Sequence, residues 1–254
     1  MLIAGSTDGI YQINGINEGN TIETTKLYDT GEVFRICQFE AIEGLFAAAD
    51  SGLCYSETGA EWTTLSLPEN QVYAVTASPS GDLLYAGTRP AGLLVGECED
   101  GVPTEEGDWE VVSGFQQLRA QNDWGIPRHD GLAQIRSLRT YPTATDRLIV
   151  GIEVGGIYVS DDSGRTWTER SIDGFDDVPH TDDIHHIELI NKDTMVASTG
   201  SGLFRSADSG RTWERLDTDH RQRYFREAFV HNGTIYAGGA PGSSSTWEDD
   251  TDHA

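Results

Sequence analysis

Two stretches of the chain repeat one eight-residue pattern, Ser160-Asp161-Asp162-Ser163-Gly164-Arg165-Thr166-Trp167 and Ser206-Ala207-Asp208-Ser209-Gly210-Arg211-Thr212-Trp213. Each follows an apolar segment that ends in Ser, and both fit S-x-D-x-G-x-T-W. The Asp at the third position can accept hydrogen bonds from nearby backbone N–H groups and from the Ser and Thr hydroxyls. The Gly can adopt a positive φ at little steric cost, and the Trp can pack against the neighbouring sheet. The pattern therefore predicts two hairpin turns of the same kind.

These turns belong to a longer internal repeat, in which an apolar strand, a small turn and a Gly precede a second apolar strand. The repeated Gly stands at positions 9, 52, 92, 156, 202 and 242, so the intervals are 43, 40, 64, 46 and 40 residues. A blade of a four-stranded propeller needs about 40–50 residues. A further apolar strand precedes five of the units, at 33–36, 72–75, 135–138, 184–187 and 224–227. The sequence predicts six units and an insertion in the long interval.

The two turns resemble the Asp box, or BNR repeat, of sialidase-like β-propellers, which are related to WD40 and YVTN repeat proteins. The resemblance covers most of the chain and implies one all-β propeller domain over 1–254, with a loop insertion around 97–132. Six blades are recognisable and the last is incomplete, so a closed ring would have six or seven. The resemblance gives a structural role on the outer part of a blade to Ser160, Asp162, Gly164, Thr166, Trp167, Ser206, Asp208, Gly210, Thr212 and Trp213.

The formal net charge is -25, and the chain has only Lys26 and Lys192 beside 15 Arg. Such a surface repels nucleic acid and anionic lipid. The charge and the scarcity of Lys favour a salt-adapted cytoplasmic protein, and the alternative is an ordinary acidic one. No apolar run has the length of a membrane helix, and the first residues do not resemble a secretory signal. The three Cys fit no metal spacing and are expected to be free thiols.

The insertion contains Trp124, Arg128 and His129 among polar residues. Insertions in repeat proteins often emerge as loops on the binding face. We therefore expect a partly ordered loop there, in which the Trp either stacks on a ligand or packs the insertion against the blades.

Four basic side chains occupy matching places on the first strands of four blades: Arg35, Arg136, His185 and Arg226. These strands line the central channel of a propeller. The side chains could form a cationic patch for a carboxylate-bearing ligand or an acidic peptide, since guanidinium groups suit carboxylates. Alternatively, they pair with the carboxylates of the chain itself.

Sialidases use three Arg, a Tyr nucleophile with a Glu partner, and an Asp acid. In this sequence the resemblance implies Arg35, Arg136 and Arg226 for the triad, with Tyr224, Glu227 and Asp50 in the catalytic roles. The family's Arg-Ile-Pro stretch is replaced by Arg35-Ile36-Cys37, which departs from the pattern.

Asp183 and His185 would share one face of a strand, but their spacing matches no metal motif, and neither a metal nor another cofactor is predicted. The favoured function is a monomeric, non-catalytic scaffold that binds a protein or an anionic small ligand at the channel mouth. Propellers of the broader family that act in photosystem assembly are such scaffolds. The alternative is a sialidase-like glycoside hydrolase acting on a carboxylate-bearing sugar.

Overall fold

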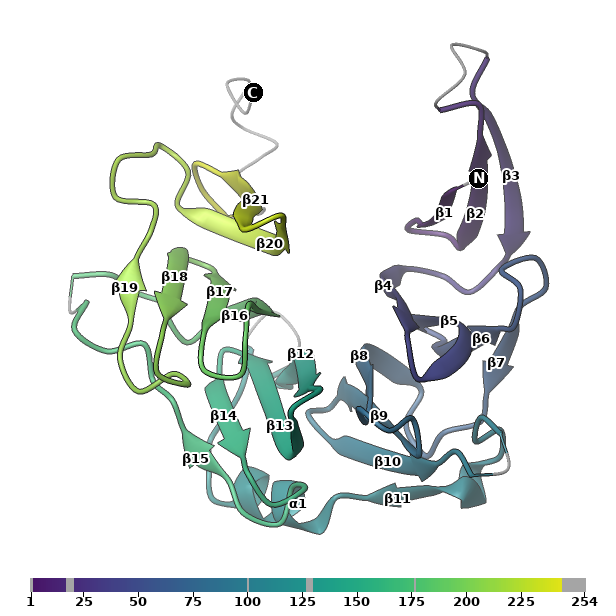
Figure 1. Ribbon diagram of the computed structural model, residues 1–254, viewed down its shortest axis with the longest axis horizontal. Helices are drawn as coiled ribbons and strands as arrows, with labels where there is room; N and C mark the ends of the chain where they lie inside the picture. The colour runs from purple at the N-terminus through teal and green to yellow at the C-terminus, as the bar shows by residue number, and fades with distance from the viewer. Residues whose placement is uncertain (1, 17–20, 100, 127–129, 176, 244–254) are drawn as a thin grey trace. The chain divides into compact units, whose positions relative to one another are not determined.

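The computed structural model describes residues 2–16, 21–99, 101–126, 130–175 and 177–243. Strands make up 51% and helices 5% of the described residues, which confirms the all-β prediction. The strands form six antiparallel sheets, and the chain divides into two compact units, Met1–Val112 and Ser113–Ala254 (Figure 1). Each unit is described in turn.

The first unit contains three sheets, ordered β1-β2-β3, β4-β5-β6-β7 and β11-β10-β9-β8. Their strands are β1 (Leu2–Gly5), β2 (Ile10–Asn14), β3 (Glu23–Tyr28), β4 (Val33–Phe39), β5 (Ile42–Ala49), β6 (Gly52–Ser56), β7 (Thr63–Leu65), β8 (Gln71–Ala77), β9 (Leu83–Arg89), β10 (Leu93–Glu97) and β11 (Trp109–Val111).

The second unit also contains three sheets, ordered β12-β13-β14-β15, β16-β17-β18-β19 and β20-β21. Its elements are α1 (Ser113–Ala120), β12 (Gln134–Tyr141), β13 (Ala144–Glu153), β14 (Gly156–Ser160), β15 (Thr168–Glu169), β16 (Ile184–Leu189), β17 (Met195–Thr199), β18 (Gly202–Ser206), β19 (Glu214–Arg215), β20 (Tyr224–His231) and β21 (Thr234–Ala240).

The middle strands of the four-stranded sheets are buried on both faces, which explains their continuous apolar sequences. In the first unit, Phe46, Leu53 and Leu84 are completely buried in one core cluster. In the second unit, Ile184, Ile187 and Phe204 of the next sheet pack with Ile149 of β13. Packing between successive sheets thus supplies the core of each unit.

The insertion is more regular than the expected loop. It contains a short 3₁₀ helix (Glu106–Asp108), the outer strand β11 and helix α1. Strand β11 pairs with β10, and Trp109 at its start is buried in the core of the first unit. The long interval therefore holds the missing fourth strand of a blade, which sequence reasoning overlooked because only three residues pair.

Helix α1 begins against the backbone of the first S-x-D turn. A Cβ on Gly114 would lie 2.2 Å from the carbonyl oxygen of Gly164 and 2.3 Å from that of Arg165, so only glycine allows this approach. The neighbouring Phe115 is buried, and its ring meets the edge of the Trp167 ring at a centroid distance of 5.5 Å. No helix among the described residues is long and apolar enough to cross a membrane.

Candidate functional site

Both repeated turns have the predicted hydrogen bonds. In the first, Asp162 accepts from the Thr166 backbone N–H at 2.8 Å and from its hydroxyl at 2.7 Å. The Ser160 hydroxyl donates to Asp162 and accepts from the Gly164 N–H. In the second turn, Asp208, Thr212, Ser206 and Gly210 repeat the same contacts, again at 2.7–2.8 Å.

The hydrogen bonds also hold these two Asp side chains in their ionised form. The backbone N–H and then the hydroxyl of Thr166 lower the pKa of Asp162 to about 2, from an ordinary value of 3.8. Thr212 does the same for Asp208, whose pKa is also about 2. Both turns connect the last two strands of a sheet, β14 to β15 and β18 to β19.

Sequence reasoning missed a third, partial copy of this turn. The Gly59 N–H donates to the Ser56 hydroxyl at 2.9 Å, and the Trp62 indole N–H donates to the Gly59 carbonyl at 3.2 Å. Its Gly has a φ of 83°, as in the other two turns. The Ser-x-x-Gly-x-x-Trp spacing was the available signal, and the loss of the Asp and Thr concealed it.

Polar side chains gather on the first strands of the second unit. Arg136 donates to the buried carboxylate of Glu153 at 2.7 Å. The ring of His185 lies 4.7 Å from that of Tyr224, and the Tyr224 hydroxyl accepts from exposed Arg226 at 3.0 Å. Two of the three Arg predicted for a cationic patch, Arg136 and Arg226, thus lie in one unit, and Arg136 has a protein carboxylate as its partner.

The residues expected for sialidase chemistry have other neighbours. Tyr224 is 4% exposed and contacts Arg226, whereas Glu227 is half exposed and lies 3.2 Å from Nε2 of His186. Asp50 belongs to the first unit, where it accepts from Gln71. Arg35 is also in the first unit, on β4, so a triad with the arginines of the second unit stays a prediction.

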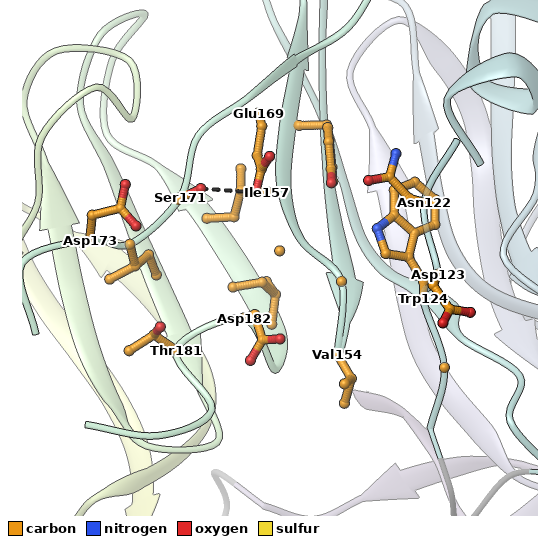
Figure 2. Close-up of a pocket in the computed structure, with 16 residues that line it drawn as sticks. Asn122, Asp123, Trp124, Val154, Ile157, Glu169, Ser171, Asp173, Thr181 and Asp182 are labelled. Carbon is orange, nitrogen blue, oxygen red and sulfur yellow. Dashed lines mark hydrogen bonds between the residues drawn. The ribbon is translucent and has the colours of Figure 1, made fainter. Parts of the chain in front are cut away.

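A cavity of about 470 Å³ lies beside β14 in the second unit. Figure 2 shows Trp124 at one side, Asp182 and Val154 at another, and Glu169 with Ser171 above them. The lining residues are Asn122, Asp123, Trp124, Gly125, Val154, Gly155, Gly156, Ile157, Tyr158, Glu169, Ser171, Ile172, Asp173, Thr181, Asp182 and Ile184. We call this cavity the Trp124 pocket.

The local backbone explains how the pocket is built. The N–H groups of Gly155 and Gly156 donate to the Asp182 carbonyl, which joins the β13–β14 turn to the loop before β16. Val154 in this turn has a φ of 55°. Successive hairpin turns lie at opposite ends of the strands in an antiparallel sheet, so the pocket lies opposite the S-x-D turn after β14.

Trp124 packs the insertion against its neighbours, which was one of the two expected alternatives, and stacking on a ligand stays a prediction. It is half-buried between the rings of Phe115 and Tyr158, at centroid distances of 5.8 and 5.2 Å, and it also lines the pocket. None of the described lining residues is Arg or Lys, and four of them carry carboxylates: Asp123, Glu169, Asp173 and Asp182. Arg128 and His129, predicted near this loop, lie outside the described residues.

Comparisons with known proteins agree with a propeller. No protein-family model matches the chain. Over 93 residues it is 41% identical to the oligoxyloglucan-reducing end-specific xyloglucanase of Emericella nidulans, a stretch that covers 34% of this chain and only 9% of that protein.

Solved structures resemble the chain over most of its length. An ancestral GH74 enzyme matches with a TM-score of 0.62 at 16% identity, covering 84% of this chain and 28% of that one. The GH74 xyloglucanase from Xanthomonas campestris gives 0.59 at 16%, covering 91% and 36%. YCF48 bound to D1 peptide gives 0.57 at 16%, covering 90% and 69%. These likenesses, with the six antiparallel sheets, show that the chain has a fold of the β-propeller type.

Proposed function

We propose that the chain is a non-catalytic, ligand-binding propeller of the Asp-box group, and that its ligand is a neutral oligosaccharide bound in the Trp124 pocket. One observation carries the proposal: the pocket combines an indole ring with four carboxylates and has no described Arg or Lys in its lining. Ligand sites are commonly concave, with an aromatic surface and a few well-placed polar groups.

The chemistry of the lining suits a ligand rich in hydroxyl groups. Ionised carboxylates only accept hydrogen bonds, and sugar hydroxyls can donate to them. The face of Trp124 offers an apolar surface for a sugar ring, whereas an anionic ligand would meet like charges on Asp123 and Asp182. The identity shared with a xyloglucanase over 93 residues supports an oligosaccharide as the ligand.

Binding without turnover is favoured by the surroundings of the candidate nucleophile. The Tyr224 hydroxyl accepts from Arg226, and the Glu227 carboxylate lies beside His186. YCF48, a structural neighbour, was solved bound to a peptide, which supports a binding role for this architecture. We further propose that the protein is monomeric, salt-adapted and cytoplasmic and that its propeller has six or seven blades. Its three cysteines form no disulfide with one another, which suits a reducing compartment.

Calorimetric titration with xyloglucan oligosaccharides in molar KCl tests the proposal. Trp124→Leu and Asp182→Asn should each weaken binding at least tenfold, because one removes the ring and the other a charged acceptor. Asp177→Asn is the matched control, since Asp177 is exposed on the same loop but does not line the pocket. Affinity that is unchanged in both pocket variants would exclude this site.

An anionic ligand at the channel mouth is the competing binding mode, and exposed Arg226 favours it. An acidic peptide and sialyllactose form the second arm of the titration. Binding of either, lost in Arg226→Ala and Arg136→Ala but kept in Trp124→Leu, would replace the oligosaccharide proposal. A peptide rich in Lys and Arg is the third arm, since a cation could also bind a Trp beside carboxylates.

A glycoside hydrolase is the second candidate function, favoured by the likeness to the xyloglucanase and by the carboxylates of the pocket. Glycoside hydrolysis generally requires two carboxyl groups on either side of the scissile bond. Release of reducing ends from xyloglucan oligosaccharides, abolished by Asp182→Asn, would overturn the non-catalytic proposal. Turnover of a fluorogenic sialoside that disappears in Tyr224→Phe would instead establish the sialidase alternative.

A further inference from the structure

Three potential metal ligands meet inside the second unit, at the end of β13 and the start of β16. Glu153 ends β13, Asp183 directly precedes β16, and His185 lies on β16. One ligand atom from each lies within 4.8 Å of the other two. The residues are 2%, 8% and 1% exposed, respectively, so this cluster is buried, unlike the many carboxylates on the surface of the chain.

The hydrogen bond of His185 fixes the chemistry of its ring. Nδ1 lies 2.6 Å from the carbonyl oxygen of Phe225, and a carbonyl can only accept, so Nδ1 carries the proton. Nε2 is completely buried and has no hydrogen-bond partner among the described residues, and it lies 3.5 Å from Oδ1 of Asp183. In the neutral ring, Nε2 carries a lone pair and can only accept, as can Oδ1 of Asp183. Two buried acceptors that face each other are unfavourable unless a positively charged group lies between them.

Glu153 is oriented by two donors of β12. Gln134 and Arg136 both donate to its Oε2, and the Arg contributes one positive charge beside two carboxylates. Metal-binding residues are commonly oriented by such contacts, and a ligating His commonly donates its other ring N–H to a carbonyl. The cluster has both features.

We propose that Glu153, Asp183 and His185 bind a divalent transition-metal ion, with Zn²⁺ as the best match. Zinc takes imidazole nitrogen and carboxylate oxygen ligands at about 2.0–2.2 Å, so two ligands of a tetrahedral site lie about 3.4 Å apart. The 3.5 Å between Nε2 of His185 and Oδ1 of Asp183 agrees with that separation. The Asp183 side chain is 12% exposed, which leaves a route for the ion. The proposal is independent of oligosaccharide binding.

Zinc uptake by the chelator-treated full chain tests the proposal. In molar KCl, to screen the acidic surface, equilibrium dialysis with Zn²⁺ should give one tightly held ion per chain. His185→Gln and Asp183→Asn should each weaken binding at least tenfold. His186→Gln is the matched control, because the adjacent buried His186 contacts Glu227 instead and should leave the affinity unchanged.

The visible absorption of bound Co²⁺ provides a second measurement, because it reports the coordination of the ion rather than the stability of the chain. The wild type should show the visible absorption of a four-coordinate Co²⁺, and Asp183→Asn, if folded by circular dichroism, should lose it. Absence of tight Zn²⁺ uptake would overturn the proposal. Tight uptake that persists in both His185→Gln and Asp183→Asn would place the ion elsewhere and also overturn it.

Discussion

The two S-x-D turns of the second unit share the hydrogen bonds made by their Ser, Asp, Gly and Thr, but they differ at the Trp and in their surroundings. At the first turn, α1 packs against the backbone through Gly114, and Phe115 meets Trp167, whose indole N–H donates to Gly164. At the second turn, the Trp213 indole nitrogen is buried and finds no hydrogen-bond partner in the part of the chain that the structure describes, and the Arg170 side chain covers Gly210.

A neighbouring Asp supports each turn in the same way. The backbone N–H of Ser163 donates to the Asp146 carbonyl, and that of Ser209 donates to the Asp193 carbonyl. Arg147 connects the two turns, because it pairs with Asp161 at 2.6 Å and donates to the Ser209 hydroxyl at 3.2 Å. The comparison shows that the motif determines the Ser, Asp, Gly and Thr hydrogen bonds, and we expect the elements packed around each turn to determine how much stability it adds.

Phe115→Ala should have the largest effect, because it removes the ring that attaches α1 to the first turn. A buried Phe→Ala substitution typically costs about 3–5 kcal/mol of unfolding free energy. Urea denaturation measures the loss. Phe229→Ala is the control, since Phe229 is 53% exposed and should change stability little. A small effect of Phe115→Ala would mean that α1 adds nothing to the first turn.

Gly114→Ala should destabilise by about 1–3 kcal/mol through overpacking, although Ala is the better helix former. The steric term dominates because the new Cβ would meet two backbone carbonyls rather than a flexible side chain. Gly107→Ala is the control, as a Cβ there meets nothing within 4 Å. A higher melting temperature for Gly114→Ala would show that α1 is not held against the turn.

Asp162→Ala and Asp208→Ala should lower the melting temperature by similar, smaller amounts, since the two carboxylates accept the same bonds. Both have a folded-state pKa of about 2, below the ordinary 3.8, so their contribution is present above pH 3.8 and is lost as the pH falls towards 2. Thermal melts across this range should show a weaker pH dependence in the double variant. Unequal losses would mean that the surroundings also control the hydrogen bonds.

Added KCl should change the melting temperature least, and it should act on the whole chain rather than on one turn. With a net charge of -25, carboxylate repulsion destabilises the folded chain at low ionic strength. Screening lengths fall from about 10 Å at 0.1 M to about 3 Å at 1 M, so the melting temperature should rise with KCl. Because screening does not distinguish the turns, the ratio of the two Asp→Ala effects should stay constant. A flat or falling melting temperature would remove the argument for salt adaptation.

The sequence predicted what depends on local chemistry. The turn hydrogen bonds of Asp162 and Asp208 and the first strands of the blades were correct, because a short pattern specifies each. Strand β11 was missed because three paired residues leave no periodic pattern, and because the burial of Trp109 depends on tertiary contacts that a local pattern does not show.

The candidate sites depend on contacts between distant residues. The aromatic packing of Trp124 on Phe115 and Tyr158, and the approach of Glu153 to His185, join segments with no shared motif. The sequence left open whether Arg136 pairs with a carboxylate of the chain itself, and only the fold shows that this carboxylate is Glu153.

The turn at the rim of the Trp124 pocket has a consequence for how this chain can change. A β-branched residue such as Val154 is rarely found at a positive φ, and such a conformation costs on the order of 1–3 kcal/mol. The two hydrogen bonds from Gly155 and Gly156 to the Asp182 carbonyl hold it in place. Replacing Val154 with glycine would relieve that backbone strain, but it would also remove a side chain from the pocket wall and loosen its edge. If the Trp124 pocket binds the oligosaccharide that we propose, laboratory evolution for heat resistance alone would favour a substitution that weakens this binding, and the two traits would be selected in opposite directions at this position.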